Sequence, residues 1–330
     1  PAFVDTTNGD YHLSAQSAAI SAGVEQLSIN GVTYTAPARD MDGVLRPNPI
    51  ATIMDLGAYE HENGVGPYDG PIWYVNGAEA LPYGNGSVSA PYSMIGSAIG
   101  AAESGDTVHV AAATYVENIN FIGKNIAVIG ADRETTIIDG NQAGTVVWFE
   151  NNDATAVLSG FTLQNGSAGS GGGMNLTYSD PTITDVTISG NTADYYGGAM
   201  YLVLAHPTIT NVTISGNTTG VNGGGMYLNG SDPTITNVTI SGNTADTYGG
   251  GMYLAGNNGS DPTITNVTIS GNTADYHGGG MYLNGSDPTI TNVTISGNTA
   301  GSSGGGIHCG VNSNPILLNT IIAGNESNEI

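Results

Sequence analysis

Acidic side chains recur at regular intervals in the second half of the chain. Asp232, Asp261 and Asp287 each precede a proline, and Asp40 and Asp42 form the short motif DMDG nearer the start. Carboxylates together with loop carbonyls are the oxygen ligands that Ca²⁺ takes in proteins. An Asp-Pro pair also builds a turn, in which case the carboxylate stays in water. The sequence leaves both interpretations open, a calcium site and a solvated turn, and it requires no other cofactor.

Four tyrosines occupy one position of a repeated motif, each directly after a methionine: Tyr201, Tyr227, Tyr253 and Tyr282. We expect them in the outward slot of a strand, where they would form an exposed aromatic stripe. Such a stripe can stack on sugar rings or pack against another fibre. It can equally be plain cross-strand stacking that stabilises a sheet. A binding surface and a structural ladder therefore remain alternatives.

Basic side chains are scarce, which restricts the partners. The chain has 28 acidic residues, a formal charge of -24, and only four basic residues, Arg39, Arg46, Lys124 and Arg133. Phosphate binding needs clustered Lys and Arg, so no nucleic-acid partner is expected. The sequence has no long apolar run, so no membrane insertion is expected either.

Histidine and cysteine offer little chemistry. His206, His277 and His308 fall on different positions of the repeat, which disfavours a stacked metal site and favours separate surface histidines. Cys309 is the single cysteine. With no basic residue after Arg133 to activate a thiolate, we expect a small buried hydrophobe.

The elements that must position these side chains are given by a repeat. The prolines at 181, 207, 233, 262, 288 and 315 are spaced by 26, 26, 29, 26 and 27 residues, around the wording GGGMY…PTITNVTISGN. Within a unit, apolar and polar residues alternate over MYL, TIT and VTI, which predicts three short strands. Because one unit cannot bury its apolar face alone, the units must stack. We predict an all-β parallel solenoid with three strands per coil.

Stacking places identical residues about 4.8 Å apart. One column should lie at the corner between the second and third strands, where an Asx residue tolerates a left-handed conformation: Asp185, Asn211, Asn237, Asn266, Asn292 and Asn319. A second column follows the third strand: Asn191, Asn217, Asn243, Asn272, Asn298 and Asn325.

These motifs resemble the right-handed β-helix of the pectate-lyase-like superfamily, with repeats similar to the polymorphic-outer-membrane-protein type of secreted bacterial proteins. Residues 104–330 resemble the coils, with near-exact repeats from about 171, and residues 67–103 a linker with a short capping helix in YSMIGSAIGAAESG. Met94, Ile95, Ala98, Ile99 and Ala102 fit one face of that helix.

Residues 1–66 resemble the segment that closes such solenoids at their C-terminal end, through FVDTTNGDYHLSAQSAAISAG, DMDGVLRP and DLGAYE. Here that segment comes first, so the chain looks circularly permuted. The resemblance suggests that it completes the last coil of a neighbouring copy, head to tail, or of the next unit in a covalent array. The expected assembly interface comprises Phe3, Val4, Tyr11, Leu13, Ile316, Leu318, Ile321, Ile322 and Ile330.

The resemblance implies an extracellular or cell-surface protein, secreted and bacterial. Head-to-tail completion of coils does not close, so we expect the protein to form a structural filament. The lyases of this superfamily rely on Arg or Lys, and none follows Arg133, so we expect no enzyme. A monomeric adhesin that binds glycans or other surface polymers is the first alternative, and a polysaccharide lyase is the second.

Overall fold

The computed structural model describes residues 3–5, 10–13, 26–29, 32–36, 46, 68–78, 84–255 and 259–327. The chain divides into two compact units, residues 1–102 and 103–330. The described elements of the first unit are β1 (Phe3–Asp5), β2 (Asp10–Leu13), β3 (Gln26–Ile29), β4 (Val32–Thr35), β5 (Ile72–Val75) and α1 (Ile95–Ala101). β1 pairs with β2, and β3 with β4, as antiparallel hairpins.

Helix α1 confirms the short helix predicted before the coils. It buries Ile95, Ala98 and Ile99 and contacts β5. The sequence pattern assigns Met94 to the same buried face, but Met94 precedes the helix and is 50% exposed. Met94 has an extended backbone conformation, with φ of -127° and ψ of 139°, and so is not part of the helix.

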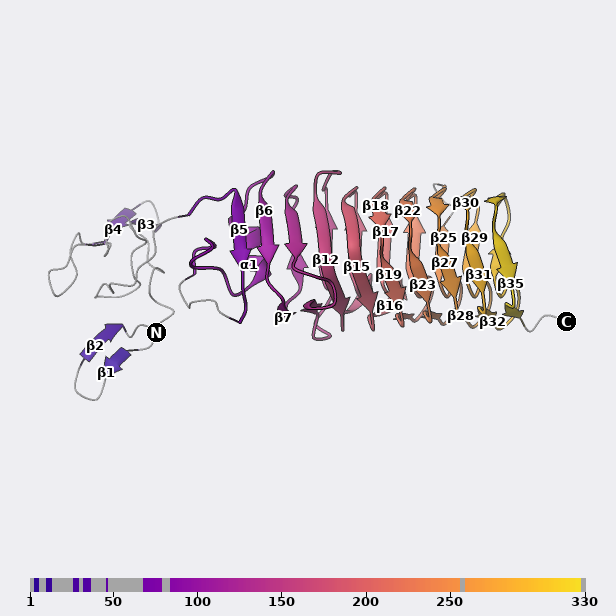
Figure 1. Cartoon of the computed structure of the whole chain (residues 1–330), viewed down its shortest axis with the longest axis horizontal. Helices are drawn as coiled ribbons and strands as arrows, with labels where there is room; N and C mark the ends of the chain where they lie inside the picture. Colours follow the sequence, from indigo (N-terminus) through magenta and orange to yellow (C-terminus); the bar gives the residue numbers. More distant parts are fainter. Residues whose placement is uncertain are drawn as a thin grey trace. The chain divides into compact units, whose positions relative to one another are not determined.

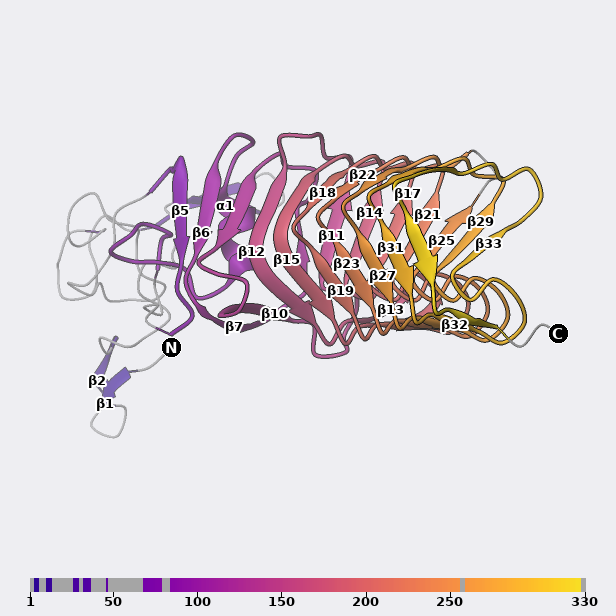
Figure 2. The same cartoon turned by 45° about the vertical axis from the view of Figure 1, so that its right-hand side comes forward.

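The second unit is a stack of parallel coils (Figures 1 and 2). Its first face is an eight-stranded sheet, made of β8 (Ile119–Asn120), β11 (Val147–Glu150), β14 (Met174–Thr177), β17 (Met200–Val203), β21 (Met226–Asn229), β25 (Met252–Ala255), β29 (Met281–Asn284) and β33 (Ile307–Cys309). The second face is a narrow seven-stranded sheet, made of β13 (Ser167–Ser170), β16 (Thr192–Tyr196), β20 (Thr218–Thr219), β24 (Thr244–Ala245), β28 (Thr273–Ala274), β32 (Thr299–Ala300) and β36 (Glu326–Ser327).

The third face is bent. In the early coils it contains β6 (Thr107–Val110), β7 (Ala113–Val116), β9 (Ala127–Gly130), β10 (Thr136–Asp139), β12 (Val157–Gln164) and β15 (Thr182–Ser189). In the repeats the strand breaks at its corner into an upper arm, β18 (Thr208–Thr210), β22 (Thr234–Thr236), β26 (Thr263–Thr265), β30 (Thr289–Thr291) and β34 (Ile316–Leu318). The lower arm is β19 (Thr213–Ser215), β23 (Thr239–Ser241), β27 (Thr268–Ser270), β31 (Thr294–Ser296) and β35 (Ile321–Ala323).

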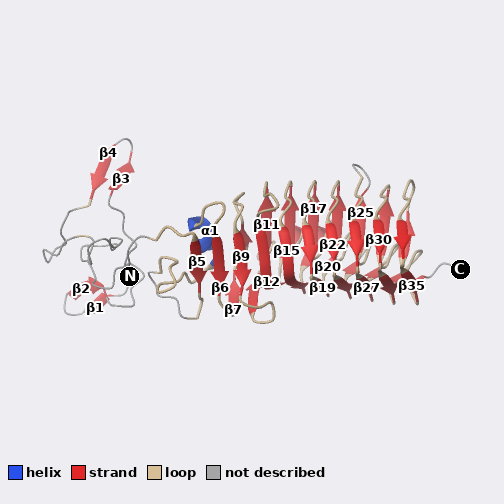
Figure 3. Ribbon diagram, turned by 45° about the horizontal axis from the view of Figure 1, so that its top comes forward, coloured by secondary structure: helices blue, strands red, loops and turns tan. Residues whose placement is uncertain are grey.

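A parallel coil with three strand faces is therefore confirmed. The predicted TIT and VTI strands are the two arms of one bent face, and the third face is a short strand at NTA that the sequence did not indicate. Inward residues behave as predicted, because Met226, Leu228, Ile235 and Ile240 are fully buried. Their alternation with outward Thr follows from the two-residue period of a strand. Loops close each coil at the edges of the sheets (Figure 3).

The corner between the two arms is set by backbone conformation. Asp185, Asn211, Asn237, Asn266, Asn292 and Asn319 have φ between 46° and 56°, as the sequence predicts for Asx residues in the left-handed region. The insertion between Leu254 and Pro262 leaves the register intact, since Thr234 pairs with Thr263 across it. Residues 256–258, where this repeat is longer than the others, lie outside the described residues.

Candidate functional site

The column of buried asparagines after the third predicted strand links successive coils by hydrogen bonds and so fixes the positions of the outward-facing residues. Asn243 is fully buried, and its Oδ1 accepts the backbone N–H and the Nδ2 of Asn217 at 3.0 and 2.9 Å. Its own Nδ2 donates to Asn272 Oδ1 at 2.9 Å and to the carbonyl of Ile214 at 3.0 Å. These bonds confirm the predicted amide column. They fix each coil to the next and therefore align the outward columns.

The aspartates before the prolines also lie in one column. Asp232, Asp261 and Asp287 each accept, through Oδ1, the backbone N–H of the matching residue in the next coil at 2.6 Å. The carboxylates therefore tie neighbouring turns together. Within the part of the chain that the structure describes, no group of three or more His, Cys, Asp or Glu side chains is suited to hold a metal. Asp40 and Asp42 lie outside the described residues, and the calcium site and the solvated turn both stay open as alternatives.

The tyrosine column is stacked and only partly exposed. Ring centroids of Tyr227 and Tyr253 are 5.1 Å apart with planes 4° from parallel, and Tyr253 and Tyr282 repeat this at 5.1 Å and 6°. Tyr253 is only 8% exposed, which corrects the expectation of an exposed stripe. A second column passes beside the first, where Tyr196 lies 4.6 Å from Tyr227 and Tyr248 lies 4.8 Å from Tyr282.

This packing limits what the tyrosines can do. The rings of Tyr227 and Tyr253 each lie between two stacked neighbours, which leaves little free ring face for a sugar to stack on. Burial is the main cause that raises the pKa of the Tyr227 phenol above its ordinary value, and charge on neighbouring tyrosines adds to the shift. The neutral, stacked form is therefore the one that the fold favours.

Two histidines that lie far apart in the repeat pattern come together. Ring centroids of His277 and His308 are 4.6 Å apart, and Ser303 Oγ lies 2.8 and 2.9 Å from their Nδ1 atoms. They belong to different repeat positions, but those positions form the two adjacent aromatic columns. His308 pairs with Tyr282 in the strand register. A signal was present in the sequence, because GGGIH replaces GGGMY in that coil.

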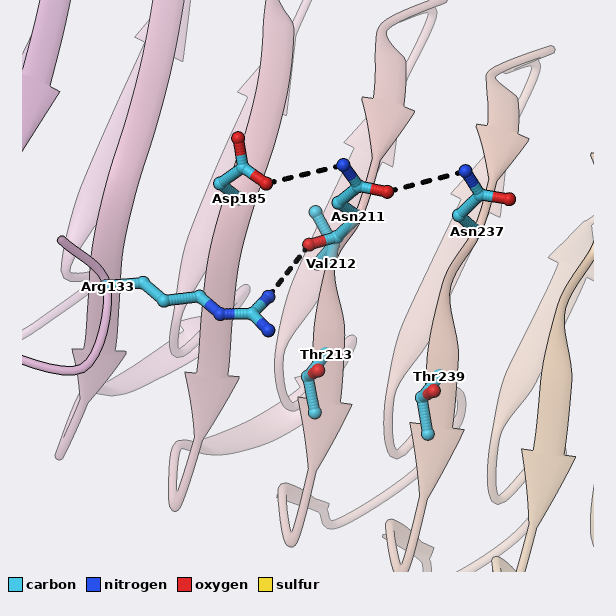
Figure 4. Close-up of a pocket in the computed structure, with 7 residues that line it drawn as sticks. All are labelled: Arg133, Asp185, Asn211, Val212, Thr213, Asn237 and Thr239. Atoms are coloured by element: carbon cyan, nitrogen blue, oxygen red, sulfur yellow. Dashed lines mark hydrogen bonds between the residues drawn. The ribbon is translucent and has the colours of Figure 1, made fainter.

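Sequence reasoning missed a polar cavity beside Arg133. A cavity of about 370 Å³ is lined by Arg133, Asp185, Asn211, Val212, Thr213, Asn237 and Thr239. Figure 4 shows the guanidinium extended along the sheet toward these strands. Its Nη1 donates to the carbonyl of Asn211 at 3.0 Å, and its Nε lies 3.4 Å from the Glu134 carboxylate. The only sequence signal was that Arg133 is the last basic residue.

The cavity is equipped for hydrogen bonding. Along its wall, Asn211 Nδ2 donates to Asp185 Oδ1 at 3.3 Å, and Asn237 Nδ2 donates to Asn211 Oδ1 at 3.4 Å. Loop 131–135, which carries Arg133, is held against β12 by the Thr162 hydroxyl, which donates to the Arg133 carbonyl at 2.7 Å. A cation, a carboxylate, amides and hydroxyls can hold a hydroxyl-rich ligand, but no nucleophile with an adjacent base lines the cavity.

Part of the expected assembly interface can be located. Ile316, Leu318, Ile321 and Ile322 of β34 and β35 are exposed. Phe3 and Val4 lie in β1, and Tyr11 and Leu13 in β2. Ile330 lies outside the described residues. Cys309, expected to be buried, is exposed, because it stands at the end of β33 with no described strand beyond it in the sheet.

No described helix is long and apolar enough to cross a membrane. No curated protein and no solved structure matches the chain. The family model for the right handed beta helix region matches residues 109–274 and 224–330. These segments cover more than half of the chain and coincide with the stacked coils, so the chain belongs to the right-handed β-helix family.

Proposed function

We propose that this chain is a non-enzymatic, extracellular structural protein whose units join end to end into a filament or surface fibre. We also assign it to the pectate-lyase-like superfamily, with repeats of the polymorphic-outer-membrane-protein type. Secretion to a bacterial cell surface is part of the proposal. The repetition of one coil chemistry along the stack supports a scaffold rather than a catalyst, since a catalytic coil would differ from its neighbours.

A change of residue type in the last described coil carries the assembly proposal. Ile316, Leu318 and Ile321 occupy outward positions, and each pairs with a threonine in the preceding coil. Their exposed fractions are 54%, 51% and 61%. These apolar side chains, in place of outward threonines, form an exposed apolar patch. A segment that binds over the patch would gain about 25 cal/mol for each Å² of apolar surface removed from water.

The segment of residues 1–66 is the proposed cover. It resembles the closing segment of a β-helix, and its hairpin of β1 and β2 supplies strands that can extend a sheet edge. The segment would come from a second copy or from the adjacent unit of a tandem array. Either source produces a fibre, because a head-to-tail contact does not close.

The test restores the residue type of the preceding coil. We expect the purified chain to form long fibres in negative-stain images and to sediment as a polymer. The triple variant Ile316→Thr, Leu318→Thr, Ile321→Thr should remain as single rods, because the apolar patch is gone. Val311→Thr removes another apolar side chain, which is 80% exposed, and serves as the control that should still elongate.

A truncation tests the cover itself. A chain that lacks residues 1–60 should give folded rods that do not elongate. If either this truncation or the triple variant forms fibres like the parent chain, the proposed interface is wrong.

A monomeric glycan-binding adhesin is the alternative, and the cavity beside Arg133 favours it more than the stacked tyrosines do. In that case Arg133→Gln should abolish oligosaccharide binding measured by calorimetry, and the parent chain should stay as single rods. Release of unsaturated sugars from pectin or alginate would instead support a polysaccharide lyase.

A further inference from the structure

The outer face of the upper arm is a regular array of threonines. Strands β15, β18, β22, β26 and β30 pair in parallel without a change of register. Each contributes two outward threonines on either side of a buried isoleucine: Thr182 and Thr184, Thr208 and Thr210, Thr234 and Thr236, Thr263 and Thr265, and Thr289 and Thr291. The face is therefore a lattice two threonines wide and five coils long.

The lattice spacing follows from strand geometry. Threonines in adjacent coils are about 4.8 Å apart, the two in one strand are about 6.6 Å apart, and the array extends for about 19 Å. Buried Ile209, Ile235 and Ile264 hold the strands from beneath. Figure 1 shows β18, β22 and β30 aligned along one side of the stack. The lattice is rigid because every strand is fixed by its neighbours and by the amide columns.

The hydroxyls of this face are available to solvent. Thr208, Thr234 and Thr263 are exposed, and the second threonine of each strand is half-exposed. In the coils from β18 to β30, none of the eight hydroxyls donates to a described protein group. The nearest charged column, which contains Asp232 and Asp261, precedes the prolines and so stands at the edge of the array. Inside the array, each position presents one methyl group and one hydroxyl.

We propose that this threonine face binds the surface of ice. The spacing of about 4.8 Å between coils lies close to the repeat of water molecules along one axis of hexagonal ice. A rigid array of hydroxyls can anchor water along that axis, while the methyl groups order the water between them. Each contact is weak, and the eight contacts of the coils from β18 to β30 act together on one rigid face.

The lower arm differs and gives the matched control. Its strands carry one threonine and one serine, as in Thr239 and Ser241 of β23. The serine lacks the methyl group. The Arg133 loop also reaches over this arm, because Thr213 and Thr239 line the Arg133 cavity. The proposal therefore assigns ice binding to the upper arm alone, and it is independent of filament formation.

The experiment measures thermal hysteresis and inhibition of ice recrystallisation by the full chain. We expect the chain to lower the freezing temperature of ice below its melting temperature and to keep ice grains small. The double variant Thr236→Lys, Thr265→Lys interrupts the centre of the array and should raise the concentration needed for inhibition by about tenfold or more. Ser241→Lys with Ser270→Lys places the same charges in the same two coils on the lower arm, away from the Arg133 cavity, and should leave inhibition unchanged.

Folding and adsorption are checked separately. Circular dichroism melting curves should be alike for the two double variants. A difference between them in inhibition of ice recrystallisation then comes from the altered surface and not from a loss of folding. Cys309 is the single cysteine and is exposed, so a fluorescent label on it should show the parent chain frozen into an ice hemisphere. The proposal is wrong if the parent chain shows neither thermal hysteresis nor fluorescence in the ice hemisphere. It is also wrong if both double variants lose inhibition equally, or if the chain adsorbs to cellulose but has no effect on ice.

Discussion

At the scale of single residues, the buried asparagines do more for stability than the exposed ones. Asn243→Ala would leave the Ile214 carbonyl and two donors of Asn217 without the partners they have at 2.9 to 3.0 Å. Buried groups without partners cost about 1 to 3 kcal/mol each. We expect the free energy of unfolding, measured by urea titration, to fall by about 3 kcal/mol or more.

The exposed corner supplies the control for this prediction. Asn266→Gly keeps the left-handed conformation, because glycine adopts the φ of 55° without strain. It removes only solvent-exposed amide bonds to Asn237 and Asn292. The loss should be below about 1 kcal/mol. Equal losses for the two variants would contradict a framework role for the buried column.

Also at this scale, the stacked tyrosines predict a dependence on alkaline pH. Burial raises the pKa of the phenols of Tyr201, Tyr227, Tyr253 and Tyr282. The folded chain therefore keeps protons that the unfolded chain releases above pH about 10. Stability is fully present below that pH and is lost as the pH rises toward the folded-state pKa values.

Urea midpoints measured across this range, together with tyrosinate absorbance, check the prediction. Tyr227→Phe removes the phenol that burial affects most and should flatten the alkaline loss of stability. An identical decline in Tyr227→Phe and the parent chain would show that the column is not its source.

At the scale of elements, the glycine-rich turns set how closely successive coils approach. A Cβ added to Gly250 would lie 2.5 Å from the carbonyl oxygen of Gly279 and closer still to that of Thr273. Both atoms belong to the backbone of the next coil, which cannot move without disturbing its own ladder. We expect Gly250→Ala to cost about 3 kcal/mol in the free energy of unfolding.

Gly242→Ala is the control that distinguishes the cost of steric contact between coils from the cost of a left-handed backbone conformation. Gly242 has φ of +61° and no neighbouring atom closer than 4.0 Å to an added Cβ. Alanine there meets only the left-handed penalty of about 1 to 2 kcal/mol. If Gly250→Ala costs no more than Gly242→Ala, the turns are not limited by contact between coils.

At the scale of the whole molecule, the net charge is -24, and some of the acidic side chains lie in columns along the stack of coils. Aspartates in one column are about 4.8 Å apart, so salt should screen their repulsion and raise the melting temperature. Because their Oδ1 atoms already accept backbone N–H groups, we expect Ca²⁺ and Mg²⁺ at equal ionic strength to raise it equally. A larger shift with Ca²⁺, measured by calorimetry, would establish a calcium-specific site.

The repeat by itself determined the coils, the inward and outward faces, and both asparagine columns. Each of these depends on alternation within one strand and on the stacking of equal positions, which are properties of local sequence. Tertiary structure decided the rest. Arg133 reaches Asn211, 78 residues away, and His277 meets His308 from another column. Distances between different columns depend on how turns and side chains pack around the coil, and repeat spacing does not encode them.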